Sequence, residues 1–180
     1  NDGIYCGGLI FGSGERKLVN GTIKSFSSIA PRLITDLMNQ KGEFTYGFSR
    51  DEQFCQIAKA VICDSSAVNP YNVTVIQHSY SNTEEDLFYV GYSFINQNQT
   101  KLKEFSAGLF VDWDVQFSSK NDGGFDLERN LVYIANESHN QYFGVVALSG
   151  LNGMKMSDEF KTLGNEEGVR RFSYIGISQV

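Results

Sequence analysis

Hydrophobic and polar residues alternate along several short segments of the chain, and polar loops separate these segments. Residues 73–80 (VTVIQHSY) are rich in β-branched side chains and alternate in polarity, which is typical of a half-buried strand. Residues 87–95 (LFYVGYSFI) form a nearly continuous apolar and aromatic run of strand length. The same criteria predict further strands at residues 5–11, 17–23, 54–63, 105–117, 131–135, 142–148 and 170–177.

One segment has a different pattern. Pro31 near the start of residues 27–40, followed by Ile34, Leu37 and Met38, predicts a short helix with the proline in its first turn. The rest of the chain shows no alternation of strands with helices, which argues against a doubly wound fold. We therefore expect an all-β fold, an antiparallel β-sandwich of jelly-roll or immunoglobulin-like style, with nine or ten strands and at most one short helix.

The chain has 180 residues, no internal repeat and no low-complexity linker, so we expect one domain spanning residues 1–180. Because the sequence starts with Asn1 and not with methionine, we expect this domain to be a piece of a larger protein. No run approaches the roughly 18 apolar residues of a membrane helix, and no signal peptide is recognisable. The formal net charge of −6 argues against nucleic-acid binding, which needs a positive surface.

Two carboxylates interrupt the apolar strand predicted at residues 105–117. In GLFVDWDVQF, alternation puts Leu109, Val111 and Trp113 on one face, while Asp112 and Asp114 share the other. Their separation along a strand is roughly 6.5–7 Å. Like charges at this distance repel, so a proton, a basic partner or a cation is expected to compensate them.

A loop rich in oxygen ligands follows this strand. The segment NDGGFD contains Asn121, Asp122 and Asp126, and its two glycines predict a tight turn. Calcium prefers six to eight oxygen ligands from carboxylates, amides and carbonyl groups. The sequence therefore predicts a structural calcium ion, with the ligand set Asp112, Asp114, Asn121, Asp122 and Asp126. The spacing does not match an EF-hand.

Two alternatives remain open. Asp112 and Asp114 lie near the separation of the two carboxyl groups in a glycoside hydrolase, so an enzyme of that class is one of them. A carbohydrate-binding or adhesion module is the other, and it requires exposed aromatic side chains in a row on one face of a sheet. The candidate aromatic residues are Tyr89, Tyr92, Tyr133 and Tyr142.

Signatures of other enzyme classes are missing from the sequence. It has no GxSxG, HExxH or Cys–His signature, and GSGER is neither a GxGxxG fingerprint nor a P-loop. His78 and His139 are the only histidines, and His78 lies in a predicted strand. We expect a non-catalytic protein.

The cysteine and asparagine residues add two further expectations. Cys6, Cys55 and Cys63 cannot all pair within the chain; Cys55 could bridge Cys63, or all three could be buried thiols. Four Asn-x-Ser/Thr triplets begin at Asn20, Asn72, Asn98 and Asn136, and we interpret them as chance occurrences in a chain rich in these residue types.

Three segments together resemble a known type of domain: GGLIFGSGERKLVNG, YVGYSFINQNQTKLKEFSAGLFVDWDV and NDGGFDLERNLVYI. They are similar to an accessory β-sandwich domain of large secreted proteins from Bacteroidetes-type bacteria. In those proteins the domain often lies beside a subtilisin-like peptidase domain and ahead of a C-terminal sorting tail. The residues that match the pattern are Gly108, Asp112, Trp113, Asp114, Asp126, Asn130, Leu131 and Tyr133.

The resemblance implies a secreted or cell-surface accessory domain without chemistry of its own. Its partners would be other domains of the same protein, and a surface glycan or protein is a further possible partner.

Overall fold

The computed structural model describes residues 4–13, 17–21, 36–48, 56–82, 84–113, 122–136, 140–148, 151–153 and 176–177. These residues contain twelve β-strands and no helix. The strands are β1 (Ile4–Ser13), β2 (Lys17–Asn20), β3 (Met38–Phe48), β4 (Gln56–Cys63), β5 (Val73–Ser81), β6 (Phe88–Asn96), β7 (Phe105–Trp113), β8 (Asp122–Asp126), β9 (Leu131–Asn136), β10 (Gln141–Val146), β11 (Leu151–Gly153) and β12 (Gly176–Ile177).

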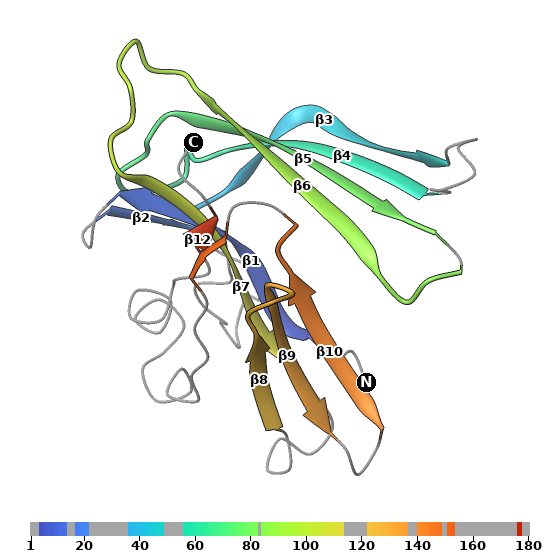
Figure 1. Cartoon of the computed structure of the whole chain (residues 1–180). Helices are drawn as coiled ribbons and strands as arrows, with labels where there is room; N and C mark the ends of the chain where they lie inside the picture. Colours follow the sequence, from blue (N-terminus) through green and yellow to red (C-terminus); the bar gives the residue numbers. More distant parts are fainter. Residues whose placement is uncertain are drawn as a thin grey trace, which may run out of the picture. The chain divides into compact units, whose positions relative to one another are not determined.

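The twelve strands form three antiparallel sheets, with orders β11-β12-β7-β1-β2, β10-β9-β8 and β3-β4-β5-β6 (Figure 1). The predicted all-β, sandwich-like class is therefore confirmed. Contacts between Cα atoms divide the chain into two compact units. The first unit combines Asn1–Thr35 with Lys103–Val180, and the second is Asp36–Leu102, inserted between these two segments. The single domain expected over residues 1–180 stays a prediction, because these contacts do not show whether the two units fold together.

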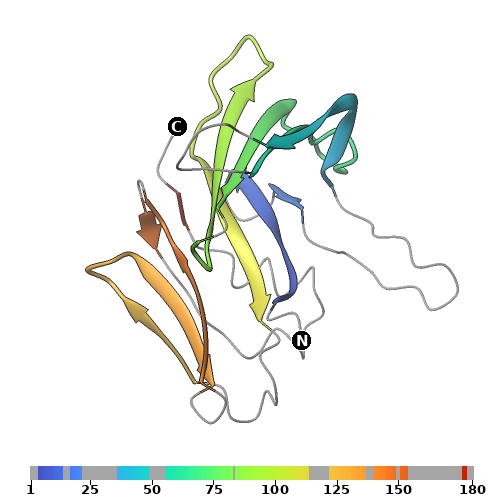
Figure 2. The same ribbon diagram turned by 90° about the vertical axis from the view of Figure 1, so that its right-hand side faces the viewer.

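In the first unit, β1 and β7 pair along almost their whole lengths although they are far apart in the sequence (Figure 2). Leu9 lies opposite Leu109, and Phe11 lies opposite both Ala107 and Val19 of β2. The Phe11 ring is 1% exposed, and its centroid lies 5.5 Å from that of Phe105. Alternating residues of three strands thus build a core on one face of this sheet, and Ile10 of β1 is buried on the other face.

The second unit is a four-stranded meander in which each strand pairs with the next. Its buried side chains gather near the start of β5, where Val73 and Val75 are almost fully enclosed. Asp64 follows β4 and is 2% exposed. Its carboxylate accepts hydrogen bonds from the backbone N–H groups of Tyr71 and Val73, the latter at 3.0 Å. A single side chain therefore holds both ends of the β4–β5 connection.

The helix predicted at residues 27–40 is contradicted at its C-terminal end, because Met38 begins β3. Residues 22–35 lie outside the described part of the chain. Three strands were not predicted at all: β3, β8 and β11. The tight turn expected at Gly123 and Gly124 is wrong, since both glycines lie within β8. The part of the chain that the structure describes holds no helix long and apolar enough to cross a membrane.

Candidate functional site: an aromatic and acidic sheet face

One face of the β8–β9–β10 sheet brings together four residues that the sequence analysis singled out. Ala135 of β9 pairs with Asp122 of β8 on one side and with Tyr142 of β10 on the other. Asp126 of β8 pairs with Leu131 of β9. Because paired residues of antiparallel strands share a face, Asp122, Asp126, Tyr133 and Tyr142 all project from the same side. We call these four residues the tyrosine–aspartate face.

Along β9 the opposite side of this sheet is the more buried one, although Phe125 of β8 on that side is 43% exposed and Ala135 on the tyrosine–aspartate face is buried. Val132 and Asn136 of β9 point to the opposite side and are almost fully enclosed. On the tyrosine–aspartate face, in contrast, Tyr133 is 38% exposed and Tyr142 is 62% exposed. The two tyrosines are diagonal neighbours on adjacent strands, with Cα atoms about 7–8 Å apart.

Tyr133 lies between two glycines, because Gly124 of β8 and Gly144 of β10 are its partners on either side. A β-carbon at position 124 would lie 2.6 Å from Tyr133 Oη and 2.8 Å from its Cζ. The tyrosine ring therefore extends across β8 into the space that any other side chain at position 124 would fill. Glycine at this position allows the ring to lie against the sheet.

Gly124 stands midway between the two carboxylates, since Asp122 and Asp126 are each two residues away on β8. Each aspartate is therefore roughly 6.5–7 Å from Gly124, Cα to Cα, and flanks the ring that covers it. The Asp122 side chain is exposed, and its Oδ1 accepts a hydrogen bond from the N–H of Gly123 at 2.9 Å. At least one carboxylate oxygen of Asp122 is thus directed to its own backbone.

Asp126 is held by Arg129 in the turn between β8 and β9. Its Oδ1 accepts from the Arg129 N–H at 3.1 Å, and its Oδ2 forms an ion pair with the guanidinium group of the same residue. The side-chain hydrogen bond from Arg129 is the main cause that lowers the pKa of Asp126. Asn130 completes the turn with φ of 51°, a left-handed conformation that asparagine tolerates well.

This arrangement suits a ligand with both apolar and hydroxyl-bearing surfaces. A tyrosine ring provides an apolar plane with one polar end, and ionised carboxylates accept hydrogen bonds strongly. Sugars combine a face of C–H groups with a rim of hydroxyl groups, so a ring flanked by carboxylates matches their chemistry.

The residues predicted to bind calcium are only partly described. Asp112 lies opposite Cys6 in the β1–β7 pair, but its side chain, Asp114 and Asn121 are outside the described residues. Asp122 and Asp126 stand at opposite ends of β8, about 13 Å apart, and not together in one loop. Within the described ranges no group of three or more His, Cys, Asp or Glu side chains is arranged to hold a metal ion. The calcium site stays a prediction.

The other aromatic candidates belong to the second unit and are less exposed. Tyr89 and Tyr92 lie on opposite faces of β6 and are both half-buried. Burial raises the pKa of the Tyr92 hydroxyl group. His78 is half-buried and its ring stacks on that of Tyr80 at 6.3 Å between centroids. His139 lies outside the described residues.

The structure also bears on the cysteines and the glycosylation triplets. Cys63 is a free thiol whose Sγ lies 3.3 Å from the Ser65 hydroxyl group, so it does not bridge to Cys55. Asn20 is 2% exposed and Asn136 is 0% exposed. A glycan would not fit on these two enclosed amides, whereas Asn72 is exposed and Asn98 is half-buried, so the interpretation that the triplets occur by chance stays a prediction.

Two residues essential to the tyrosine–aspartate face escaped the sequence analysis, namely Gly124 and Arg129. The sequence could have indicated Gly124, because alternation in DGGFD places Asp122, Gly124 and Asp126 on one side of a strand. It was missed because two consecutive glycines favour a turn.

Comparisons with protein-family models, with curated proteins and with solved structures gave no match. The resemblance to the accessory domains of secreted proteins therefore stays a prediction.

Proposed function

We propose that this chain is a non-catalytic, extracellular binding module of a larger secreted protein, and that its tyrosine–aspartate face binds carbohydrate. The observation that carries the carbohydrate proposal is the Tyr133 ring, which lies over Gly124 between Asp122 and Asp126. A ring that is already fixed against the sheet loses little conformational entropy when a ligand stacks on it. Tyr142, diagonally next to it, extends the apolar surface toward β10.

The module part of the proposal is supported by the sequence resemblance. The partners of the module would be the neighbouring domains of the same secreted protein, and its tyrosine–aspartate face would bind a surface glycan. A complete reading frame without a secretion signal and without any further domain would contradict this part. Such a reading frame would not contradict carbohydrate binding, which is tested separately.

Carbohydrate binding is tested by screening the chain on a glycan array and measuring the best ligand by isothermal titration calorimetry. We expect Tyr133→Ala to weaken binding at least about tenfold, because truncating a central aromatic hot-spot residue of an interface costs about 2 kcal/mol. We expect Gly124→Ala to weaken it as well, since the new β-carbon would displace the Tyr133 ring.

Phe125→Ala is the matched control for these variants. Phe125 is an exposed aromatic residue of the same strand, but it projects from the opposite face. Its replacement should leave the affinity within about twofold, which is a small effect beside a tenfold loss. If Phe125→Ala and Tyr133→Ala weaken binding equally, or if no glycan binds, the carbohydrate proposal is wrong.

We also propose a structural calcium ion at Asp112 and Asp114, on the basis of the sequence pattern alone. An ion bound only by the folded chain at a hundred times its dissociation constant adds about 2.7 kcal/mol of stability. For a chain of this length we expect the melting temperature to rise by roughly 5–10 °C in excess calcium relative to chelator. The measurement is differential scanning calorimetry, with Asp112→Asn/Asp114→Asn as the variant that should lose the response. An equal melting temperature with calcium and with chelator would rule the ion out.

A further inference from the structure

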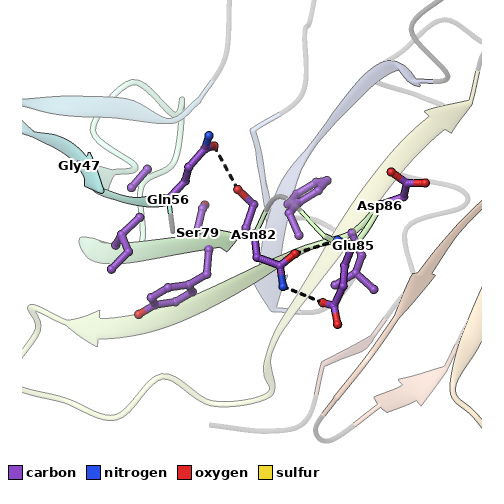
Figure 3. Close-up of a pocket in the computed structure, with 12 residues that line it drawn as sticks. Gly47, Gln56, Ser79, Asn82, Glu85 and Asp86 are labelled. Carbon is purple, nitrogen blue, oxygen red and sulfur yellow. Dashed lines mark hydrogen bonds between the residues drawn. The ribbon is translucent and has the colours of Figure 1, made fainter. Parts of the chain in front are cut away.

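A groove in the second unit is formed where β4 begins and where the chain turns from β5 into β6. Its volume is about 650 Å³, which is within the size range of ligand pockets. The labelled residues in Figure 3 show Asn82 between Gln56 on one side and Glu85 with Asp86 on the other. The residues that line the groove are Gly47, Gln56, Ile57, Ala58, Ser79, Tyr80, Ser81, Asn82, Glu85, Asp86, Leu87 and Phe88.

The acidic side of the groove is held in place by Asn82. Its Oδ1 accepts hydrogen bonds from the N–H groups of Glu84 at 3.0 Å and of Glu85 at 2.8 Å. Its Nδ2 donates to Glu85 Oε2 at 3.2 Å (Figure 3). This side chain therefore shapes the turn and at the same time orients the carboxylate of Glu85.

The opposite side of the groove offers neutral acceptors. The Ser81 hydroxyl group donates to Gln56 Oε1 at 3.2 Å, and these two residues face each other across β4 and β5. Ser79 lies two residues earlier on the same face, and its Oγ accepts a hydrogen bond from Gln77 at 3.2 Å. Backbone pairing therefore fixes the position of each of these polar groups.

An apolar wall completes the groove. Phe88 pairs with Ser81 at the start of β6 and is 65% exposed, while Leu87 just before it is also exposed. A ligand that covers these side chains would remove apolar surface from water. None of the twelve lining residues is basic, so the lining supplies no cation to neutralise Glu85 and Asp86.

From this lining we infer that the groove binds an arginine side chain of a peptide or protein partner. A guanidinium group is planar, permanently charged and rich in donors, and it stacks on aromatic rings while it pairs with carboxylates. The groove combines these complementary features: two carboxylates, amide and hydroxyl acceptors, and the exposed ring of Phe88. Its volume exceeds that of one side chain, so residues next to the arginine would fit as well. This inference concerns the second unit and does not depend on carbohydrate binding by the tyrosine–aspartate face.

The experiment uses the full chain, labelled with ¹⁵N, and the probe peptide acetyl-Gly-Arg-Gly-amide. We expect the amide signals of Ser79, Ser81, Asn82 and Phe88 to shift as the peptide is added at low salt. The peptide with citrulline in place of arginine is the uncharged isostere, and we expect it to bind about tenfold or more weakly. Shifts that are the same for both peptides, or that lie only in the first unit, would overturn the inference.

Three variants identify the groups responsible. Glu85→Gln and Asp86→Asn should each weaken arginine binding by about 2- to 5-fold, as expected for exposed ion pairs, and Phe88→Ala should weaken it by a similar factor. Glu128→Gln removes the same charge from an exposed position of the first unit and should leave the affinity unchanged. An affinity that falls equally in Glu85→Gln and Glu128→Gln would show a response to net charge alone and would contradict a built site.

Discussion

Replacing Phe11 by alanine is expected to lower the free energy of unfolding by about 3–5 kcal/mol. The Phe11 ring is almost fully enclosed and packs against the ring of Phe105. Phe11 belongs to β1, the strand that lies between β2 and β7 in the sheet. Its removal leaves a cavity that strands paired on both sides cannot collapse to fill. Chemical denaturation in urea, followed by circular dichroism, measures the loss.

Two further variants make this result specific. Phe11→Leu keeps most of the volume and should cost clearly less than Phe11→Ala. Leu148→Ala removes an apolar side chain that is largely exposed, and its effect should stay within about 0.5 kcal/mol. A loss for Phe11→Ala no larger than that for Leu148→Ala would mean that β1 is not a core strand.

Replacing Asp64 by alanine is expected to lower the free energy of unfolding by roughly 2–6 kcal/mol. The carboxylate accepts hydrogen bonds from two backbone N–H groups, of Tyr71 and Val73, in an enclosed position. Alanine removes both acceptors, and each buried donor left unpaired costs about 1–3 kcal/mol. Urea denaturation again provides the measurement.

Asp64→Asn separates the loss of charge from the loss of shape. The amide oxygen can still accept one of the two hydrogen bonds, but the NH₂ group would face the other donor, so an intermediate loss is expected. Glu84→Ala is the control, because Glu84 is an exposed acidic residue of the same unit. Equal stability of Asp64→Ala and Glu84→Ala would show that the carboxylate does not hold the β4–β5 connection.

Phe11 and Asp64 also report on the domain organisation, because they belong to different units. If residues 1–180 behave as the single domain predicted from the sequence, both variants shift one common unfolding transition. If the two units unfold separately, each variant shifts only the transition of its own unit. Calorimetry of the two variants therefore tests a prediction that the fold alone leaves open.

The sequence was most informative where side chains decide the structure. β5 and β6 were predicted almost to the residue, because β-branched and aromatic side chains dominate VTVIQHSY and LFYVGYSFI. β1, β9 and β10 were found for the same reason, with boundaries shifted by one or two residues. β4 and β7 were found as well, and residues 54–55 and 114–117 of their predicted ranges lie outside the described part of the chain.

The strands that the sequence analysis missed are stabilised by their neighbours. The segment MNQKGEFTYGF of β3 is polar and irregular, and its pairing with β4 shifts register between Asn39 and Phe44. Such an irregularity breaks the period of two on which a strand prediction depends. The segment DGGFD has low strand propensity, but pairing with β9 holds it as β8, and the Tyr133 ring covers its second glycine.

The candidate site was predictable in its residue types but not in its grouping. Asp122, Asp126, Tyr133 and Tyr142 had each been selected, the aspartates as metal ligands and the tyrosines as a platform. Only the β8–β9–β10 register shows that they share one face. The groove could not be predicted, because its residues come from β3, β4 and β5–β6 and meet only through cross-strand pairing.

The pairing of β1 with β7 has a consequence for synthesis of the chain. Leu9 and its partner Leu109 are one hundred residues apart, so a ribosome that adds roughly 5–20 residues per second needs about 5–20 seconds between them. During that time the second unit, a meander of neighbouring strands, can complete its own hydrogen bonds. Until β7 is made, the edge of β1 that does not pair with β2 has no hydrogen-bonding partner strand. We therefore expect the nascent chain to need protection at β1 until β7 has left the ribosome.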